Sequence, residues 1–318
     1  MTTFAMVFPG QGSQRVGMLA EIAASYPNNV KATFAKASAV LDYDLLRLVE
    51  HGPAEELNNT WQTQPALLTA SVVIWQIWQR LNGNGTMPMF MAGHSLGEYS
   101  ALVCAGVLDF SSAVKLVALR GMLMHKVIPT GTGAMSAIIG LDNAAISAAC
   151  EQAAQGQIVS PANFNSPGQV VIAGHKEAVE RASIICKAAG AKRTQMLSVS
   201  VPSHCILMKP AAKQLAQVLE TIHFSIPQVP VVNNVDVCAA TDPAIIRQAL
   251  VRQLYSPVRW TETIEYFSAQ GIDTLLEIGP GKVLTGFTKR IINTLSCTAV
   301  QDKISLATVI KDKSGGKL

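Results

Sequence analysis

The chain has 318 residues, of which 49% are hydrophobic and only 14% are charged, and its formal net charge is +4. This composition excludes a disordered protein, because it can bury a large core, and the weak positive charge does not indicate a nucleic-acid-binding protein. No apolar run reaches the roughly 18 residues that a membrane span needs, and the N-terminus does not resemble a signal peptide. We therefore expect a cytoplasmic protein that binds neither membrane nor nucleic acid.

Short apolar runs of strand type alternate with helical segments along most of the chain. The expected strands are residues 5–8, 89–92, 229–232 and 274–278, and the clearest helical segments are residues 65–80, 111–127 and 210–222. Alternation of this kind predicts an α/β fold, in which helices cover a parallel sheet.

The stretch from about residue 131 to residue 198 follows a different pattern. Its expected elements are strand 134–141, helix 143–155, strands 158–163 and 169–173, helix 176–189 and strand 193–199. The order β-α-β-β-α-β is that of a ferredoxin-like unit. We therefore expect a large α/β domain (residues 1–128 and 200–318) and a small inserted ferredoxin-like domain (residues 129–199), with a cleft between them as the natural site.

A serine lies between an expected strand and an expected helix. Residues 93–97 read Gly-His-Ser-Leu-Gly, after the strand 89–92 and before the helix-like residues 97–107. Glycines permit the sharp turn of a nucleophile elbow, and the first N–H groups of the following helix can stabilise an oxyanion. This context predicts that Ser95 is the nucleophile of an acyl-transfer enzyme, although the pentapeptide alone also occurs in structural turns.

The serine needs a base, and His204 has the most suitable position among the six histidines. It lies in Val-Pro-Ser-His-Cys, residues 201–205, where the chain leaves the insert and re-enters the large domain. That junction borders the expected cleft, although His204 could instead be a buried structural histidine. His94 is adjacent to Ser95, so its side chain should point away from it. Three others have polar surroundings typical of the surface: His51, His125 and His175.

An acid that would complete a Ser–His–acid triad is not evident. Four carboxylates are possible, but none has a persuasive setting: Asp236, Asp242, Asp273 and Glu277. A backbone carbonyl could orient the histidine instead. The six cysteines are scattered without a Cys-x-x-Cys pair, which predicts neither a metal site nor a disulfide framework.

Arg120 stands within an otherwise apolar segment of the helix 111–127. It either reaches solvent or faces the cleft, where its fork of donors would suit a substrate carboxylate. The loop at residues 8–14, Phe-Pro-Gly-Gln-Gly-Ser-Gln, lacks the spacing of phosphate-binding loops. A loop that supplies a second backbone N–H to an oxyanion fits it better.

Several segments together carry a family resemblance over nearly the whole chain. They are residues 7–14, Trp-Gln-Thr-Gln-Pro-Ala-Leu at 61–67, Gly-His-Ser-Leu-Gly-Glu at 93–98, Arg-Gly at 120–121, Asn-Phe-Asn-Ser-Pro-Gly-Gln at 163–169, Pro-Ser-His at 202–204, Gln-Leu-Tyr-Ser-Pro-Val at 253–258 and Glu-Ile-Gly-Pro-Gly at 277–281. In this order and spacing the chain closely resembles the bacterial malonyl-CoA:acyl carrier protein transacylases of fatty-acid synthesis. The resemblance implies a hydrolase-like large α/β domain with a ferredoxin-like insert.

The resemblance also implies roles for individual residues. Ser95 would be the nucleophile and His204 its base, oriented by the backbone carbonyl of Gln253. Arg120 would bind the malonyl carboxylate. The remaining implied roles are backbone oxyanion donors at Gln11 and Leu96, and substrate-binding side chains at Gln64 and His94.

The implied substrate is malonyl-CoA, with no cofactor, and the implied partner is an acidic acyl carrier protein. Six basic residues are candidates for docking that carrier: Lys187, Lys192, Arg193, Lys282, Lys289 and Arg290. A serine thioesterase or esterase, a non-catalytic acyl-CoA-binding protein and a stand-alone polyketide-pathway acyltransferase remain alternatives. Ser203 is a position at which related acyltransferases differ with α-substituted substrates, so methylmalonyl use stays open.

Overall fold

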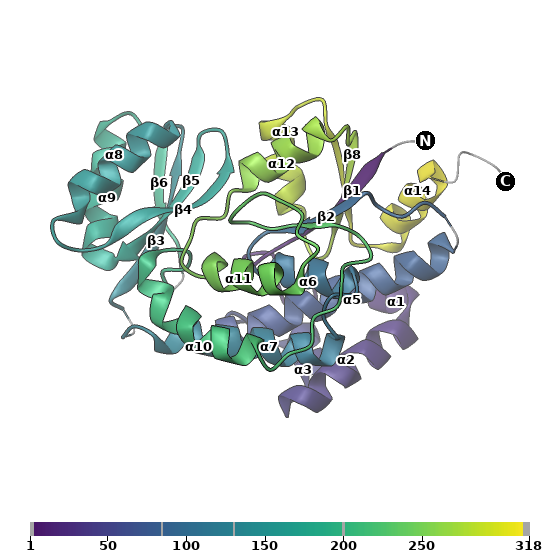
Figure 1. Ribbon diagram of the computed structural model, residues 1–318. Helices are drawn as coiled ribbons and strands as arrows, with labels where there is room; N and C mark the ends of the chain where they lie inside the picture. The colour runs from purple at the N-terminus through teal and green to yellow at the C-terminus, as the bar shows by residue number, and fades with distance from the viewer. Residues whose placement is uncertain (1–2, 84, 130, 199–200, 314–318) are drawn as a thin grey trace.

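The computed structural model describes residues 3–83, 85–129, 131–198 and 201–313, which form a large α/β body and a smaller lobe (Figure 1). Residue 199, the end of the last strand expected in the insert, lies outside these ranges. None of the helices in the described ranges is both long and apolar enough to cross a membrane.

The large body is built on a five-stranded sheet in the order β7-β2-β1-β8-β9. Its strands are β1 (Phe4–Phe8), β2 (Phe90–Gly93), β7 (Val231–Val232), β8 (Thr274–Ile278) and β9 (Ser296–Val300). Every pair of neighbours is parallel. The carboxyl ends of β2 and β7 therefore meet at one edge, where ligand sites of parallel sheets form.

Side-chain alternation along β1 divides the core into two layers. Phe4, Met6 and Phe8 pack with α2 (Pro27–Leu41), α5 (Thr60–Asn82) and α7 (Phe110–Lys126) on one face of the sheet. Ala5 and Val7 pack with α12 (Trp260–Ala269) and α13 (Val283–Ile291) on the other face. Successive strand residues point to opposite faces, so a central strand covered on both sides must be apolar throughout. Figure 1 shows these two helical layers below and above β1 and β2.

The remaining helices complete the large body. They are α1 (Ala20–Ser25), α3 (Leu45–His51), α4 (Ala54–Leu57), α6 (Leu96–Cys104), α10 (Lys209–Leu219), α11 (Pro243–Gln253) and α14 (Lys303–Lys313), with a short 3-10 turn at Ile206–Met208. The expectation that a helix begins at Pro65 is wrong, because α5 starts at Thr60. Its first turn is held by Thr63, whose hydroxyl donates to the carbonyls of Leu57 and Asn59.

The small lobe is a four-stranded antiparallel sheet in the order β4-β5-β3-β6. It comprises β3 (Gly133–Ile139), α8 (Asn143–Ala154), β4 (Val159–Ser166), β5 (Gln169–His175), α9 (Lys176–Ala188) and β6 (Arg193–Met196), and it has its own apolar core between the sheet and the two helices. The predicted fold class, a parallel α/β body with an antiparallel ferredoxin-like unit, is confirmed. The boundaries at residues 128/129 and 199/200 stay a prediction.

A strand-like contact joins the two parts. The N–H of Phe164 on β4 donates to the carbonyl of Val258 (2.9 Å), and the N–H of Val258 donates to the carbonyl of Ala162 (2.9 Å). Arg290 of α13 reinforces this seam by donating to Gln169 on β5 (2.9 Å). The small lobe is thus fixed against the large body beside the carboxyl edge of the parallel sheet.

Candidate active site

Ser95 occupies a tight turn between β2 and α6. Its backbone angles are φ 53° and ψ −107°, a conformation that residues other than glycine rarely adopt. The glycines on either side are required by packing: a Cβ on Gly97 would lie 2.0 Å from the carbonyl oxygen of Phe8, and one on Gly93 would lie 1.8 Å from the carbonyl carbon of Gly97. The turn therefore places the serine hydroxyl beyond the end of the strand, as a nucleophile elbow does.

His204 lies against Ser95 across the carboxyl edge of the sheet. Its Nε2 is 2.7 Å from Ser95 Oγ, and its Nδ1 is 2.7 Å from the backbone carbonyl oxygen of Gln253. A carbonyl oxygen can only accept, so Nδ1 carries the proton and Nε2 is free to accept one from the hydroxyl. The structure thus brings together Ser95, His204 and the Gln253 carbonyl.

None of the four carboxylates considered for a triad orients His204. Asp236 pairs with Arg252, and Asp242 caps α11 by accepting from the N–H of Ala244. Glu277 accepts from the first N–H groups of α13, and Asp273 accepts from the hydroxyl of Thr274. The geometry is a Ser–His pair with a backbone acceptor.

Burial and charge keep the imidazole neutral. His204 is 3% exposed, and desolvation together with the nearby positive charge of Arg120 lowers its pKa to about 3. A neutral imidazole beside a hydroxyl can take the proton at neutral pH without first losing one of its own.

Arg120 is fully buried and faces the site rather than solvent. Its Nη1 donates to Gln64 Oε1 (2.8 Å), and its Nη2 donates to Gln253 Oε1 (3.0 Å) and lies 3.3 Å from Ser95 Oγ. The guanidinium also lies over the ring of Tyr99, with 5.3 Å between the two centres. Within the described ranges no carboxylate forms a salt bridge with it. A buried cation held by neutral oxygens beside a nucleophile favours an anionic substrate.

The expected oxyanion donors, Leu96 and Gln11, follow the carboxyl ends of two neighbouring parallel strands, β2 and β1. Leu96 is the first residue of α6, so its N–H has no acceptor within the helix. Gln11 follows β1, and its side-chain oxygen accepts from the hydroxyl of Thr60 (3.0 Å). Their oxyanion role stays a prediction.

His94 points away from the serine toward the small lobe. Its Nε2 is 2.8 Å from Asn165 Oδ1 on β4, and its ring packs near Trp260 and Phe287. Burial lowers the pKa of His94, so it too is neutral. The contact ties the elbow to the small lobe, and the expected role in substrate binding stays a prediction.

Two residues at the site were not singled out from the sequence. Glu98 of α6 is buried, and its Oε2 accepts from the backbone N–H of Asn234 (3.0 Å) and from Gln253 Nε2 (2.8 Å). Asn234 Oδ1 accepts from the N–H of Ser95 (2.8 Å), and its Nδ2 donates to the carbonyl of Gly93 (2.8 Å). The sequence signals for them are an acidic residue in an apolar helix and the second of two asparagines that follow the expected strand 229–232.

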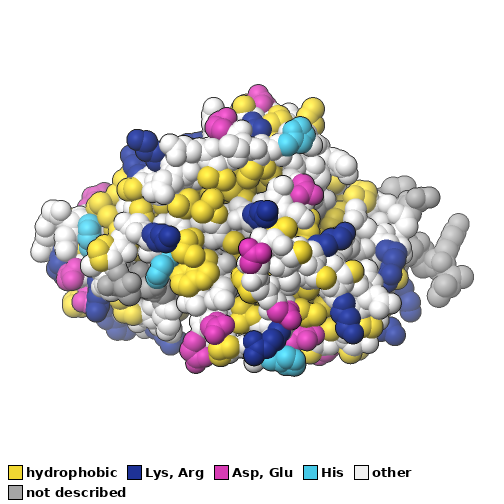
Figure 2. Space-filling view, turned by 90° about the horizontal axis from the view of Figure 1, so that it is seen from below, with side chains coloured by type: hydrophobic (Ala, Val, Ile, Leu, Met, Phe, Trp, Pro, Cys, Tyr) yellow, Lys and Arg dark blue, Asp and Glu magenta, His cyan; other side chains and the backbone are white. Residues whose placement is uncertain are grey.

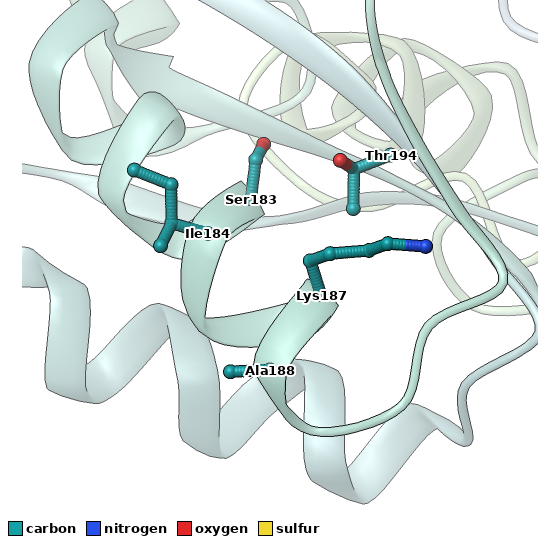
Figure 3. Close-up of a pocket in the computed structure, with 5 residues that line it drawn as sticks. All are labelled: Ser183, Ile184, Lys187, Ala188 and Thr194. Atoms are coloured by element: carbon teal, nitrogen blue, oxygen red, sulfur yellow. The ribbon is translucent and has the colours of Figure 1, made fainter.

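All six basic docking candidates have exposed side chains, but two of them make contacts within the fold. Arg290 bonds Ser166 and Gln169, and Lys187 donates to the carbonyls of Ala191 and Lys192. Lys187 also borders a hollow of about 440 Å³ between α9 and β6, shown in Figure 3 with Ser183, Ile184, Ala188 and Thr194. Figure 2 shows Lys and Arg side chains beside hydrophobic ones on the face seen from below, with acidic side chains interspersed.

The strained serine, the carbonyl-oriented histidine and the buried arginine at the edge of a parallel sheet define a serine acyltransferase site. Residues 5–317 match the family described as "Acyl transferase domain". The chain belongs to this family and, within it, to the malonyl CoA-acyl carrier protein transacylases.

Two curated relatives illustrate the similarity. The "Malonyl CoA-acyl carrier protein transacylase" of Salmonella typhimurium is 66% identical over 310 residues, covering 98% of this chain and 99% of the relative. That of Bacillus subtilis is 44% identical over 312 residues, covering 98% of this chain and 97% of the relative.

Two solved structures have the same fold. An acyl carrier protein S-malonyltransferase from Vibrio cholerae superposes with a TM-score of 0.94 at 64% identity, covering 97% of this chain and all of the other. A malonyl-transacylase in complex with its type II PKS acyl-carrier protein gives a TM-score of 0.96 at 66% identity, covering 98% of this chain and all of the other.

Alanine at Gly97 should disrupt the elbow. Because the new Cβ would lie 2.0 Å from a backbone oxygen, Gly97→Ala should destabilise the protein by about 1–3 kcal/mol and slow modification of Ser95 by a sulfonyl fluoride. Gly286→Ala is the matched control, because a Cβ there meets nothing within 4 Å on α13. Thermal unfolding and inactivation rates check this, and equal behaviour of the two variants would contradict the packing argument.

The low pKa of His204 predicts an unusual pH dependence. The base must be neutral to act, and its pKa lies far below the ordinary 6.5, so inactivation of Ser95 by a sulfonyl fluoride should keep its full rate down to about pH 5. Arg120→Ala removes a positive charge near His204, so the pH at which the inactivation rate falls should move to a higher value. A wild-type acid limb centred near pH 6.5 would contradict this account.

Proposed function

We propose that this protein transfers a malonyl group from coenzyme A to the thiol of an acyl carrier protein, for fatty-acid synthesis. The observation that carries the proposal is the buried Arg120 guanidinium, 3.3 Å from the Ser95 hydroxyl. Its planar fork of donors is suited to a carboxylate that is joined to the thioester carbonyl by a single methylene group, as in malonyl-CoA. The family membership of the chain supports the same substrate.

The proposed reaction has two halves. Ser95 Oγ attacks the thioester carbonyl while His204 Nε2 takes its proton, and the N–H groups of Gln11 and Leu96 stabilise the oxyanion. The C–S bond breaks, His204 protonates the leaving thiolate, and a malonyl-serine ester remains. In the second half the carrier thiol gives its proton to His204 and attacks the ester, which releases Ser95 and returns the proton to its oxygen. The chemistry uses no metal or cofactor.

Transfer instead of hydrolysis requires that water be kept from the ester. His204 and Arg120 are almost wholly removed from solvent, and Gln64, which accepts from Arg120, is fully buried as well. Such deep burial of the groups beside the partly exposed Ser95 is consistent with an ester that survives until the carrier thiol arrives.

We also propose that the acidic carrier docks on exposed basic residues. Lys192, Arg193, Lys282 and Lys289 support this part of the proposal, since all four side chains are exposed. Lys187 and Arg290 are weaker candidates because they also bond within the fold. The cytoplasmic location expected from the sequence belongs to the same proposal.

A second candidate function is malonyl transfer to a polyketide-pathway carrier. A specific observation favours it: the 66%-identical malonyl-transacylase structure is a complex with a type II PKS acyl-carrier protein. The two functions share the acyl donor and differ only in the carrier. Transfer rates to a fatty-acid carrier and to a polyketide carrier, each compared at several concentrations, separate them.

Replacing the arginine should change acyl selectivity. In Arg120→Ala the malonyl carboxylate loses its partner, so malonyl transfer should fall by up to about 10⁴-fold and the preference for malonyl over acetyl should relax. The assay mixes the protein with malonyl-, methylmalonyl- or acetyl-CoA, with and without carrier, and measures acyl carrier and free acid.

The variant Arg120→Lys serves as the matched control for this assay. It keeps the charge but not the fork, so it should retain more malonyl transfer than Arg120→Ala. Near-normal malonyl transfer by Arg120→Ala would remove the assigned role. Formation of free malonate at the same rate with and without carrier would instead indicate a thioesterase.

A further inference from the structure

A cluster of three polar side chains lies beneath the reacting groups. Glu98, Asn234 and Gln253 are 2%, 0% and 0% exposed. They come from α6, from the segment after β7 and from the end of α11. A single carboxylate oxygen, Glu98 Oε2, accepts from the backbone N–H of Asn234 and from the side-chain amide of Gln253.

One arm of this cluster holds the strained serine. With its backbone N–H bonded to Glu98, Asn234 directs its side-chain amide at the segment that enters the elbow. The oxygen accepts from the N–H of Ser95, and the nitrogen donates to the carbonyl of Gly93. These two bonds hold the two consecutive peptide units that lead into Ser95, whose φ of 53° persists only when the surroundings enforce it.

The other arm holds both the arginine and the histidine. Gln253 Nε2 donates to Glu98 and to the carbonyl of Ser95, and Gln253 Oε1 accepts from Arg120. The backbone carbonyl of the same residue accepts from His204 Nδ1.

The side-chain amide of Gln253 has two possible orientations, and Glu98 selects one of them. If it were flipped, its NH₂ group would oppose the guanidinium donors. Glu98 Oε2, which accepts from the NH₂ group of this amide, therefore keeps the amide oxygen facing Arg120.

We infer that Glu98 is the positioning residue of this site: its Oε2 fixes Asn234 and Gln253, and through them it sets the serine, the arginine and the histidine at once. The inference rests on the proposed function for the role of Arg120 in acyl selectivity, but not for the placement of Ser95. Glu98 itself touches no reacting atom. It lies in the field of Arg120, and burial raises its pKa to about 7 against the hydrogen bonds from Gln253 and Asn234.

The two bonds converge on one oxygen, which makes a conservative replacement informative. Glu98→Gln can place its amide oxygen where Oε2 lies and keep both bonds without the charge. It should therefore retain Ser95 acylation by malonyl-CoA within about tenfold. Glu98→Met keeps the size but accepts nothing, and a displaced site should lower the acylation rate by about 100-fold. Its malonyl-to-acetyl ratio should fall as well.

A structural control and two arm variants complete the experiment. Leu102→Ala removes a buried apolar side chain from the same helix but none of the hydrogen bonds of the cluster, so it reports the effect of lost stability with these bonds intact. Asn234→Ala should lower the rate of Ser95 acylation equally with malonyl and acetyl donors. Gln253→Met keeps the backbone carbonyl, so it should lower the malonyl-to-acetyl ratio more than it slows sulfonyl fluoride modification of Ser95.

The inference is overturned if Glu98→Met acylates Ser95 at the rate of a Leu102→Ala protein of equal melting temperature. It is also overturned if Glu98→Gln is as slow as Glu98→Met, because rescue by a neutral acceptor is its central expectation. Should Glu98→Met not fold, equal effects of the two arm variants on rate and ratio would contradict it. Absence of malonyl transfer in the wild type would refute the proposed function, while sulfonyl fluoride kinetics would still test the placement of Ser95.

Discussion

The rest of the site depends on a buried positive charge. Arg120 has no exposed surface, and its guanidinium is held by the side-chain oxygens of Gln64 and Gln253 instead of by a carboxylate partner. Burial lowers its pKa but leaves it a cation in the ordinary range of pH. Burial of His204 and this same charge together lower the pKa of His204 and keep that base neutral. An acyl group with a carboxylate would complete the arrangement, whereas an acetyl group would leave the charge uncompensated.

The backbone does much of the positioning at this site. The histidine is oriented by a peptide carbonyl, and the serine is displayed by a strained turn whose neighbours must be glycine. Peptide groups at the ends of α6 and α11 are fixed by the packing of those helices on the sheet. A site built this way needs no triad acid, which explains why none of the candidate carboxylates contacts His204.

Much of the fold could be predicted because its signals are local. Residues 5–8 and 274–278 are apolar runs typical of buried parallel strands, and the β-α-β-β-α-β order of the insert is explicit in the sequence. β9 (Ser296–Val300) was not predicted, since an edge strand in which four of five residues are polar or small has little hydrophobic signal. Ser95, His204 and Arg120 could be proposed from motifs, but the link between Glu98 and Asn234 depends on β7 pairing with β2, and no sequence pattern shows that.

Isolation of the acyl-enzyme shows most directly whether Ser95 carries the malonyl group. The protein is mixed with malonyl-CoA alone, quenched in acid, digested and mapped by mass spectrometry, with Ser95→Ala as the control. We expect one malonyl ester on Ser95, release of an equal amount of coenzyme A, and loss of the ester when carrier thiol is added. A malonyl adduct that persists in Ser95→Ala, or free malonate formed with no adduct on Ser95, would contradict it.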